Sequence, residues 1–258
     1  MTPRILFAAV AALSLASCGG NDAVSGGNSA GGTTSGGTVA GTSTAAVTPS
    51  AAGQKWIDTV VKTPEGGYRM GNPDAAIKVV EYGSRTCPTC GAFGQTGQKP
   101  LTDNYVSTGK VSYEFRDYLV HGQPDFAPSL LGRCVGTATF FPLLEAMYVA
   151  QPQFEAKLAD QAATTALQTQ LQGKTPNEAA AAWGDYLGYV EFVKQRGIPE
   201  AKARACIADK AALDEIIGMM SKGDGAAVTG TPTFIINGAK VDGVTWADVE
   251  AALKRAGA

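Results

Sequence analysis

Histidine is almost absent from this 258-residue sequence, which contains only His121, and neither sign of charge dominates. The 21 Lys and Arg residues nearly balance the 23 Asp and Glu residues, for a net charge of −2 at pH 7. No basic stripe interleaved with aromatic residues is present. We therefore exclude nucleic acid as a partner, because nothing in the sequence provides an electrostatic attraction to it.

An apolar run long enough to cross a bilayer is missing from the N-terminus. The stretch MTPRILFAAVAALSLASC has one basic residue, Arg4, and an apolar run from Ile5 to about Ala16. This length is typical of a signal-peptide core and too short for a membrane span. The final letters, LASC, resemble the bacterial lipobox, which implies a signal peptide at 1–17 and lipidation of Cys18.

An ordinary secretory signal is the alternative, in which cleavage elsewhere removes Cys18 or leaves it as a free thiol. Gly19 follows Cys18, where enteric bacteria place Asp to mark retention in the inner membrane. This difference favours the outer membrane weakly.

Large apolar residues are nearly missing from 19–53, which consists mainly of Gly, Ser, Thr and Ala. Such a segment cannot bury enough surface to offset the entropy lost on ordering, so we predict a flexible tether. Together with Cys18 it spans 18–53. It would hold a folded domain, 54–258, near a membrane surface without inserting it.

The folded domain begins with a mixture of helix and strand patterns. Apolar residues at helical spacing predict a helix over 54–63. A helix should begin after Cys87, with a kink or an early end caused by its glycines and Pro100. Three strands are expected where β-branched or alternating apolar residues occur, at 68–70, 77–82 and 111–118.

A helical block at about 125–225 follows, and turn residues divide it into about five helices. Strand patterns return over 229–243, where Asn237-Gly238 marks a hairpin. The chain ends in a helix over 245–257 that Thr245 caps. We therefore predict an α/β domain with a helical insertion between the third strand and the C-terminal hairpin.

Cysteine is scarce, with five residues in the chain. Setting Cys18 aside leaves Cys87, Cys90, Cys134 and Cys206, and an even number in an exported chain suggests two pairs. A structural zinc site needs four ligands, and single, widely separated cysteines with one histidine do not provide them. We therefore expect no metal. A purely structural bridge between Cys87 and Cys90 is also a weak alternative, because it would close only a very short loop.

The position of the motif Cys87-Pro88-Thr89-Cys90, between a strand and a helix, favours a redox pair. At a helix N-terminus, unpaired backbone N–H groups and the helix dipole lower the pKa of a thiol. Cys87 is therefore the expected nucleophile. Cys90, one turn further along, should be less accessible and should resolve the mixed disulfide.

The stretch VVEYGSRTCPTCGAF, followed far downstream by TGTPTFIING, resembles the thioredoxin superfamily and, within it, the DsbA-like thiol–disulfide oxidoreductases. The resemblance covers roughly 54–257 and implies a thioredoxin-like fold. It also implies a cis peptide between Thr231 and Pro232, in a loop that lies beside the sulfurs and binds the substrate backbone. A trans proline at the start of an edge strand is the alternative.

The resemblance also suggests roles for residues around the motif. Glu81 corresponds to a buried acid that exchanges a proton with Cys90; a partly exposed carboxylate paired with a lysine is the alternative. Thr89 departs from the best-known members of the family, which have histidine there, and a neutral hydroxyl stabilises a thiolate less. Arg85 could stabilise the thiolate, but we expect a solvated loop charge. We expect His121 on the surface, away from the sulfurs.

Some members of this family have a second disulfide in the insertion, which implies that Cys134 and Cys206 are bridged. Two buried free thiols are the alternative. A bridge across so long a segment would restrict the unfolded chain and thereby stabilise the folded state by about 4 kcal/mol.

These features together predict an envelope thiol–disulfide oxidoreductase that acts on exported proteins and needs no cofactor. We expect it in the periplasm as a monomer, lipid-anchored to the inner or outer bacterial membrane and served by a membrane redox partner. One alternative is a reductase or isomerase kept reduced by such a partner. A non-catalytic envelope binding module is the other.

Replacing Thr89 by histidine should lower the pKa of Cys87 and make the protein more oxidising. A charge-assisted hydrogen bond is worth about 1 kcal/mol more than a neutral one. For a two-electron couple this corresponds to about 20 mV. Thiolate absorbance against pH and a glutathione redox titration of Thr89→His and the wild type measure the two effects. An unchanged or more reducing variant would show that this position does not set the potential.

Overall fold

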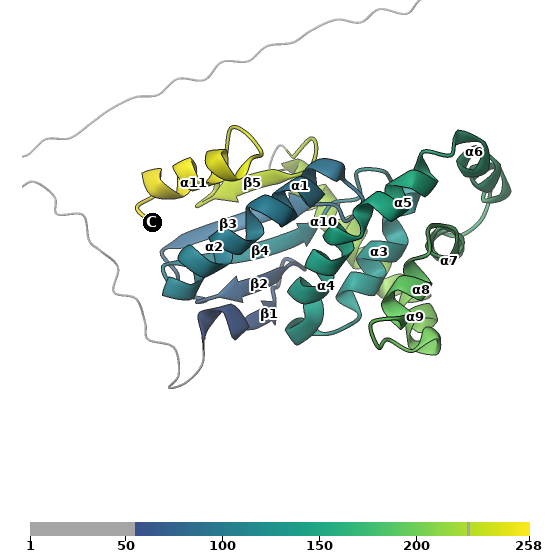
Figure 1. Cartoon of the computed structure of the whole chain (residues 1–258), viewed down its shortest axis with the longest axis horizontal. Helices are drawn as coiled ribbons and strands as arrows, with labels where there is room; N and C mark the ends of the chain where they lie inside the picture. Colours follow the sequence, from purple (N-terminus) through teal and green to yellow (C-terminus); the bar gives the residue numbers. More distant parts are fainter. Residues whose placement is uncertain (1–54, 226–227) are drawn as a thin grey trace, which may run out of the picture. The chain divides into compact units, whose positions relative to one another are not determined.

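A six-stranded sheet organises the described chain, which comprises residues 55–225 and 228–258 of a computed structural model (Figure 1). The sheet order is β1-β2-β4-β3-β5-β6. The strands are β1 Val60–Lys62, β2 Tyr68–Gly71, β3 Ile77–Gly83, β4 Val111–Asp117, β5 Thr233–Ile236 and β6 Ala239–Lys240. β3 and β4 pair in parallel, and the other neighbours pair antiparallel. The predicted signal peptide, Cys18 and the tether lie outside the described residues.

Helices accompany the sheet, and in Figure 1 the helices α1, α2 and α4 lie across one of its faces. The α-helices of the described segments are α1 Pro88–Thr96, α2 Gln98–Asn104, α3 Gln123–Arg133, α4 Thr137–Val149, α5 Gln151–Leu158, α6 Gln161–Gln170, α7 Pro176–Leu187, α8 Tyr189–Lys194, α9 Glu200–Ile207, α10 Lys210–Gly225 and α11 Trp246–Arg255. The helices α3 to α10 all lie between β4 and β5 in the chain. The predicted fold, α/β with a helical insertion after the third predicted strand, is thus confirmed.

The helix predicted over 54–63 is wrong. A short 3-10 helix at Trp56–Asp58 is followed by β1, which pairs antiparallel with β2 so that Val60 lies opposite Met70. The apolar spacing fits either structure, but the β-branched pair at 60–61 favours a strand. Pairing along the edge of the sheet also supplies backbone hydrogen bonds that a single turn of helix lacks.

The helical insertion is more finely divided than predicted, with eight helices over 123–225 where about five were expected. The turn signals that were missed include glycines in the left-handed region. Gly136 (φ 80°) precedes α4, and Gly188 (φ 93°) separates α7 from α8. A residue with a side chain is strained at such angles, so these glycines end helices that composition alone would continue.

The predicted break in the helix after Cys87 lies at Gly97, between α1 and α2. The space there is already filled, since a Cβ on Gly97 would come within 2.5 Å of the Phe93 ring. The predicted hairpin joins β5 to β6, with Asn237 and Gly238 both at positive φ. These turn residues thus behave as their sequence indicates.

Two buried clusters hold the described chain together. One packs aromatic residues of α1 and α4 on the sheet, and includes Phe93 against Phe234 with ring centroids 4.4 Å apart and Tyr113 against Phe141 at 5.4 Å. The other fills the helical insertion around Trp183, which is fully buried. None of the described helices combines the length and the apolar character that a bilayer crossing requires.

A disulfide links Cys134 to Cys206, 72 residues apart in sequence, with their Cα atoms 5.9 Å apart. Cys134 caps the C-terminus of α3, and Cys206 lies in α9. The bridge therefore fastens two helices of the insertion and is separate from the Cys87-Cys90 motif. Its expected effect is on stability, through the long loop that it closes in the unfolded chain.

Replacing both Cys134 and Cys206 by serine should destabilise the protein by about 4 kcal/mol, or about 10 °C in Tm. The thiolate titration of Cys87 should stay unchanged, because neither bridged sulfur contacts the motif. Thermal unfolding and thiolate absorbance of the double variant test this, together with non-reducing peptide mapping of the wild type. A free Cys134 in protein isolated without reductant would contradict the bridge.

Candidate active site

The two cysteines of the motif differ in exposure. Cys87 is the N-cap residue of α1, directly after the loop 84–86 that leaves β3, and Pro88 occupies the first turn. The side chains of Pro88 and Thr89 are exposed, whereas Cys87 is 7% exposed and Cys90 is 0% exposed. Both cysteines are free thiols. Of the two, only the Cys87 sulfur can therefore react with another molecule, either as the attacking thiolate or as the sulfur that is attacked.

The surroundings of Cys87 favour its thiolate. Its pKa is lowered to about 5, first by a hydrogen bond from the Cys90 thiol and then by the Thr231 side chain and the backbone N–H groups of Cys90 and Thr89, against the opposing effect of burial. The Thr231 hydroxyl is buried and has no hydrogen-bond partner among the described residues, so it is free to donate to the thiolate. When protonated, the Cys87 thiol donates to the Thr231 carbonyl at 3.3 Å. The expected acidification at the helix N-terminus is thus supplemented by the second thiol.

Cys90 shows the opposite shift. Burial raises its pKa well above the ordinary thiol value, and the charges of Cys87 and Glu81 add to the effect. The backbone N–H of Ser84 donates weakly to its sulfur, at 3.5 Å. At neutral pH Cys90 is therefore a protonated donor to the Cys87 thiolate. It can act as a nucleophile only if a neighbouring group removes its proton.

Glu81 is a buried carboxyl group that interacts electrostatically with both cysteines. It lies in β3, is 1% exposed, and accepts a hydrogen bond from the Tyr113 hydroxyl at 2.6 Å on one carboxyl oxygen. Its other oxygen has no partner in the described part of the chain. Burial raises the pKa of Glu81 to about 8, with Tyr113 opposing and the Cys87 charge adding to the rise. Glu81 can therefore hold or release a proton near neutral pH.

The loop before Cys87 is supported by an amide that sequence reasoning missed. Gln151, the first residue of α5, donates through Nε2 to the carbonyls of Arg85 at 3.1 Å and Cys87 at 2.8 Å. It is 3% exposed, and a Cβ on Gly91 would collide with its Oε1. Gln151 carries no sequence signal, because it is one of many glutamines in the insertion. Only the fold brings it to the motif.

Arg85 is not the solvated loop charge that we predicted. It is fully buried and pairs with Asp117 at the end of β4, with its guanidinium 5.3 and 5.1 Å from the ring centroids of Phe115 and Phe140. The prediction failed because the parallel register places Gly83 beside Asp117, so the next residues of the loop point into the sheet–helix interface. A buried charge of this kind needs its partner.

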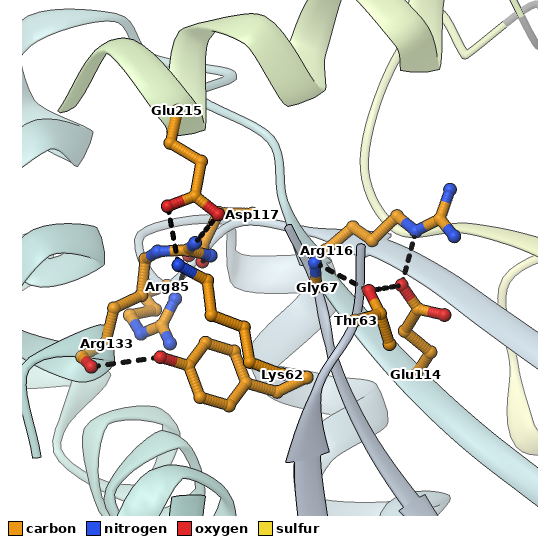
Figure 2. A network of polar contacts seen from close by, with 10 residues as sticks. Lys62, Thr63, Gly67, Arg85, Glu114, Arg116, Asp117, Arg133 and Glu215 are labelled. Carbon is orange, nitrogen blue, oxygen red and sulfur yellow. Dashed lines mark hydrogen bonds and ion pairs between the residues drawn. The ribbon is translucent and has the colours of Figure 1, made fainter. Parts of the chain in front are cut away.

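The ion pair of Arg85 belongs to a larger network, drawn in Figure 2. Asp117 also accepts from Arg133 at 3.3 Å, Arg133 pairs with Glu215 at 3.1 Å, and Lys62 reaches Glu215 at 2.7 Å. The members come from β1, the motif loop, β4, α3 and α10. The network thus ties the loop before Cys87 to the insertion.

His121 is half-exposed, as predicted for a surface residue, but it contacts the residue directly before the motif, which the sequence did not indicate. Its Nδ1 lies 2.7 Å from the hydroxyl of Thr86, the residue before Cys87. Its backbone N–H donates to buried Asp125 at 2.8 Å. Because β3 and β4 end at the same edge of the sheet, the loops that follow them meet, and this adjacency cannot be read from the sequence.

The Thr231-Pro232 peptide bond is cis, and Pro232 is buried directly before β5. Since β5 pairs antiparallel with β3, the loop before it lies beside the motif that follows β3. The structure therefore brings together residues from distant parts of the sequence. They are Cys87, Cys90, Glu81, Thr231 and Pro232.

A C-x-x-C motif that begins a helix beside a cis-proline loop, on this sheet and with these opposed thiol pKa values, defines a thiol–disulfide oxidoreductase of the thioredoxin type. A sequence model of the thioredoxin family matches residues 63–255, and the chain belongs to that family.

Individual relatives agree with this assignment. A candidate protein-disulfide oxidoreductase of Rickettsia bellii is 26% identical over 210 residues, 78% of this chain and 69% of that protein. Disulfide bond formation protein D of Bacillus subtilis is 26% identical over 89 residues, 33% of this chain and 40% of that protein.

Solved structures show the same fold. The crystal structure of a protein-disulfide isomerase from Novosphingobium aromaticivorans has a TM-score of 0.68 and 27% identity, and the match covers 74% of this chain and 97% of that one. Wolbachia pipientis alpha-DsbA1 has a TM-score of 0.57 at 19% identity, with 75% and 91% covered.

Replacing Glu81 by glutamine should change how stability depends on pH. The folded pKa of about 8 lies above the ordinary value of 4.5. The stability that the protonated carboxyl provides is therefore complete below about pH 4.5 and is lost as the pH rises to about 8. Glu81→Gln cannot ionise, so its advantage over the wild type should grow across this range, to about 4 kcal/mol at most.

Urea unfolding of both proteins across this pH range, with the active-site thiols reduced, measures the difference. Glu65→Gln, at an exposed position, is the matched control and should follow the wild type. Parallel stability curves for Glu81→Gln and the wild type would show that Glu81 ionises normally in the folded protein.

Proposed function

We propose that this chain exchanges disulfides with exported proteins in the bacterial envelope through Cys87 and Cys90. The observation that carries the proposal is the asymmetry of the two thiols. One is acidified and reaches the surface, whereas the other is buried, has a raised pKa and lies among groups that include an unpaired carboxyl oxygen. A nucleophile or leaving group and a resolving thiol need these contrasting properties.

In the oxidising direction, the enzyme starts with a Cys87–Cys90 disulfide. A substrate thiolate attacks the Cys87 sulfur, the bond between the two cysteines breaks, and Cys90 leaves as a thiolate. Glu81 supplies the proton that Cys90 takes up, consistent with its pKa of about 8. A second substrate thiolate then attacks the substrate sulfur of the mixed disulfide, and the Cys87 thiolate leaves. The substrate gains a disulfide, and the enzyme gains the two electrons.

The low pKa of Cys87 favours this direction. A stabilised thiolate stabilises the reduced enzyme, and such an enzyme gives its disulfide to substrates readily. Re-oxidation then requires a membrane redox partner. The second candidate is a reductase or isomerase that a membrane partner keeps reduced, and the similarity to the Novosphingobium protein-disulfide isomerase favours it.

The proposed location rests on the N-terminal sequence alone. Lipidation of Cys18 and a tether through residue 53 would hold the domain in the periplasm beside the inner or outer membrane. The chain would then meet exported substrates as a monomer.

Replacing Cys90 by alanine should trap substrates, because the remaining Cys87 thiolate can form a mixed disulfide that no second thiol resolves. Non-reducing gels of cells that express Cys90→Ala should show covalent complexes that reductant removes. Cys87→Ala is the matched control and should trap few or none, since Cys90 is buried and protonated. Equal or stronger trapping by Cys87→Ala would reverse the assignment of the nucleophile.

Two assays separate the candidate directions. Alkylation trapping in the cell should find the Cys87-Cys90 pair oxidised in a disulfide donor and reduced in a reductase or isomerase. Insulin reduction and refolding of a scrambled substrate, each with Cys87→Ser as control, test for exchange itself. Wild-type activity no higher than that of Cys87→Ser would contradict the proposed function.

A further inference from the structure

The chain's one histidine lies in a hydrogen-bonded chain that ends at a buried carboxylate. The loop between β4 and α3 carries His121, and its Nδ1 is 2.7 Å from Thr86 Oγ1. The Thr86 hydroxyl donates to Asp125 Oδ1, and Ser84 Oγ lies 3.1 Å from the same hydroxyl. Asp125 is 1% exposed and also accepts the backbone N–H of His121.

The direction of these hydrogen bonds follows from the number of hydrogens available. A threonine hydroxyl has one hydrogen to donate and two lone pairs that accept. Because Thr86 donates its hydrogen to Asp125, His121 Nδ1 and Ser84 Oγ must both donate to Thr86. Nδ1 therefore carries a hydrogen. The outer nitrogen of the ring is the site that gains or loses the proton when the imidazole titrates.

The charged groups around His121 are acidic. Its pKa is raised first by Asp125 on α3 and further by the charges of Cys87 at the start of α1 and Glu155 on α5, against partial burial. No cation is among these groups in the described segments. The surroundings therefore favour the imidazolium, and the charge of Cys87, the residue directly after Thr86, contributes to this effect.

We propose that His121 is a positioning residue whose imidazolium, held by Thr86 and Asp125 directly before the motif, stabilises the Cys87 thiolate. It supplies from the loop after β4 the positive charge that the motif lacks with Thr89 between its cysteines. No bond forms or breaks at His121, and its proton stays in place through the exchange. This inference rests on the proposed role of Cys87 as the nucleophile.

The interaction must shift the pKa values of His121 and Cys87 by equal amounts, because a coupling between two sites is reciprocal. If the imidazolium stabilises the thiolate, the pKa of His121 is higher in the dithiol form, where Cys87 is charged, than in the disulfide form, where it is not. His121 is the one histidine of the chain, so its ring resonances need no assignment among competitors. An NMR pH titration of the two redox forms measures the difference directly.

We expect the pKa of His121 to be about half a unit higher in the dithiol form, since the ring is 44% exposed and solvent screens the interaction. His121→Gln, which keeps a hydrogen-bond donor without the charge, should raise the pKa of Cys87 by the same amount. Half a unit is a threefold loss in the acid dissociation constant of Cys87, which should make the protein about 15 mV more reducing. Raising the salt concentration should reduce both differences.

Two variants separate charge from loop structure. His121→Lys retains a positive charge and should recover part of the Cys87 pKa shift. Lys210→Gln removes an exposed cation that pairs with Asp214 on α10, and it should leave the Cys87 pKa unchanged. An effect of Lys210→Gln as large as that of His121→Gln would mean that net charge, and not the position of His121, is responsible.

Equal His121 pKa values in the two redox forms would overturn this inference, as would an unchanged Cys87 pKa in His121→Gln. Insulin reduction by the wild type would still occur in that case, since the exchange depends on Cys87 and Cys90. Failure of the proposed function is a separate result, in which the wild type is no more active than Cys87→Ser.

Discussion

The parallel pairing of β3 with β4 is the constraint on which the rest of the site depends. It sets Gly83 beside Asp117, so that both strands end at one edge and the loops after them meet. The buried ion pair of Arg85 with Asp117 and the contact of Thr86 with His121 both follow from that meeting. A strand that slipped by one residue would turn every one of its side chains to the other face of the sheet and separate these partners.

The three acidic groups of the site, Cys87, Cys90 and Glu81, carry one negative charge between them near neutral pH. The Cys87 thiolate raises the pKa of Glu81, and the Glu81 charge raises that of Cys90. In the dithiol form the charge therefore resides on the surface-facing sulfur, while the carboxyl and the inner thiol stay protonated. When the Cys90 sulfur leaves as an anion, the Glu81 carboxyl can transfer its proton to that sulfur. The negative charge then resides on the buried carboxylate. Burial of Glu81 is what makes this exchange possible near neutral pH.

The sequence predicts the fold class and the chemistry of the motif because both depend on local patterns: the strand before Cys87, proline at the helix start, and Asn237-Gly238 in the hairpin. Its errors concern contacts between distant segments. Arg85 resembles any loop arginine until β4 places Asp117 against it, and Gln151 resembles the other glutamines of the insertion. The helix predicted over 54–63 became a strand because the neighbouring edge offered a partner. Such contacts have no signature within a short window of sequence.

Gln151 gives the insertion a consequence for protein engineering. Its amide spans two carbonyls of the motif loop, and it comes from α5, well inside the inserted helices. Arg133 and Asp125, also from the insertion, hold the same loop through Asp117 and Thr86. A shortened chain that joined β4 directly to β5 would retain the sheet and the C-P-T-C letters but leave buried polar groups unsatisfied around them. The active centre is thus a joint product of both parts of the fold, and it cannot be transplanted as a four-residue cassette.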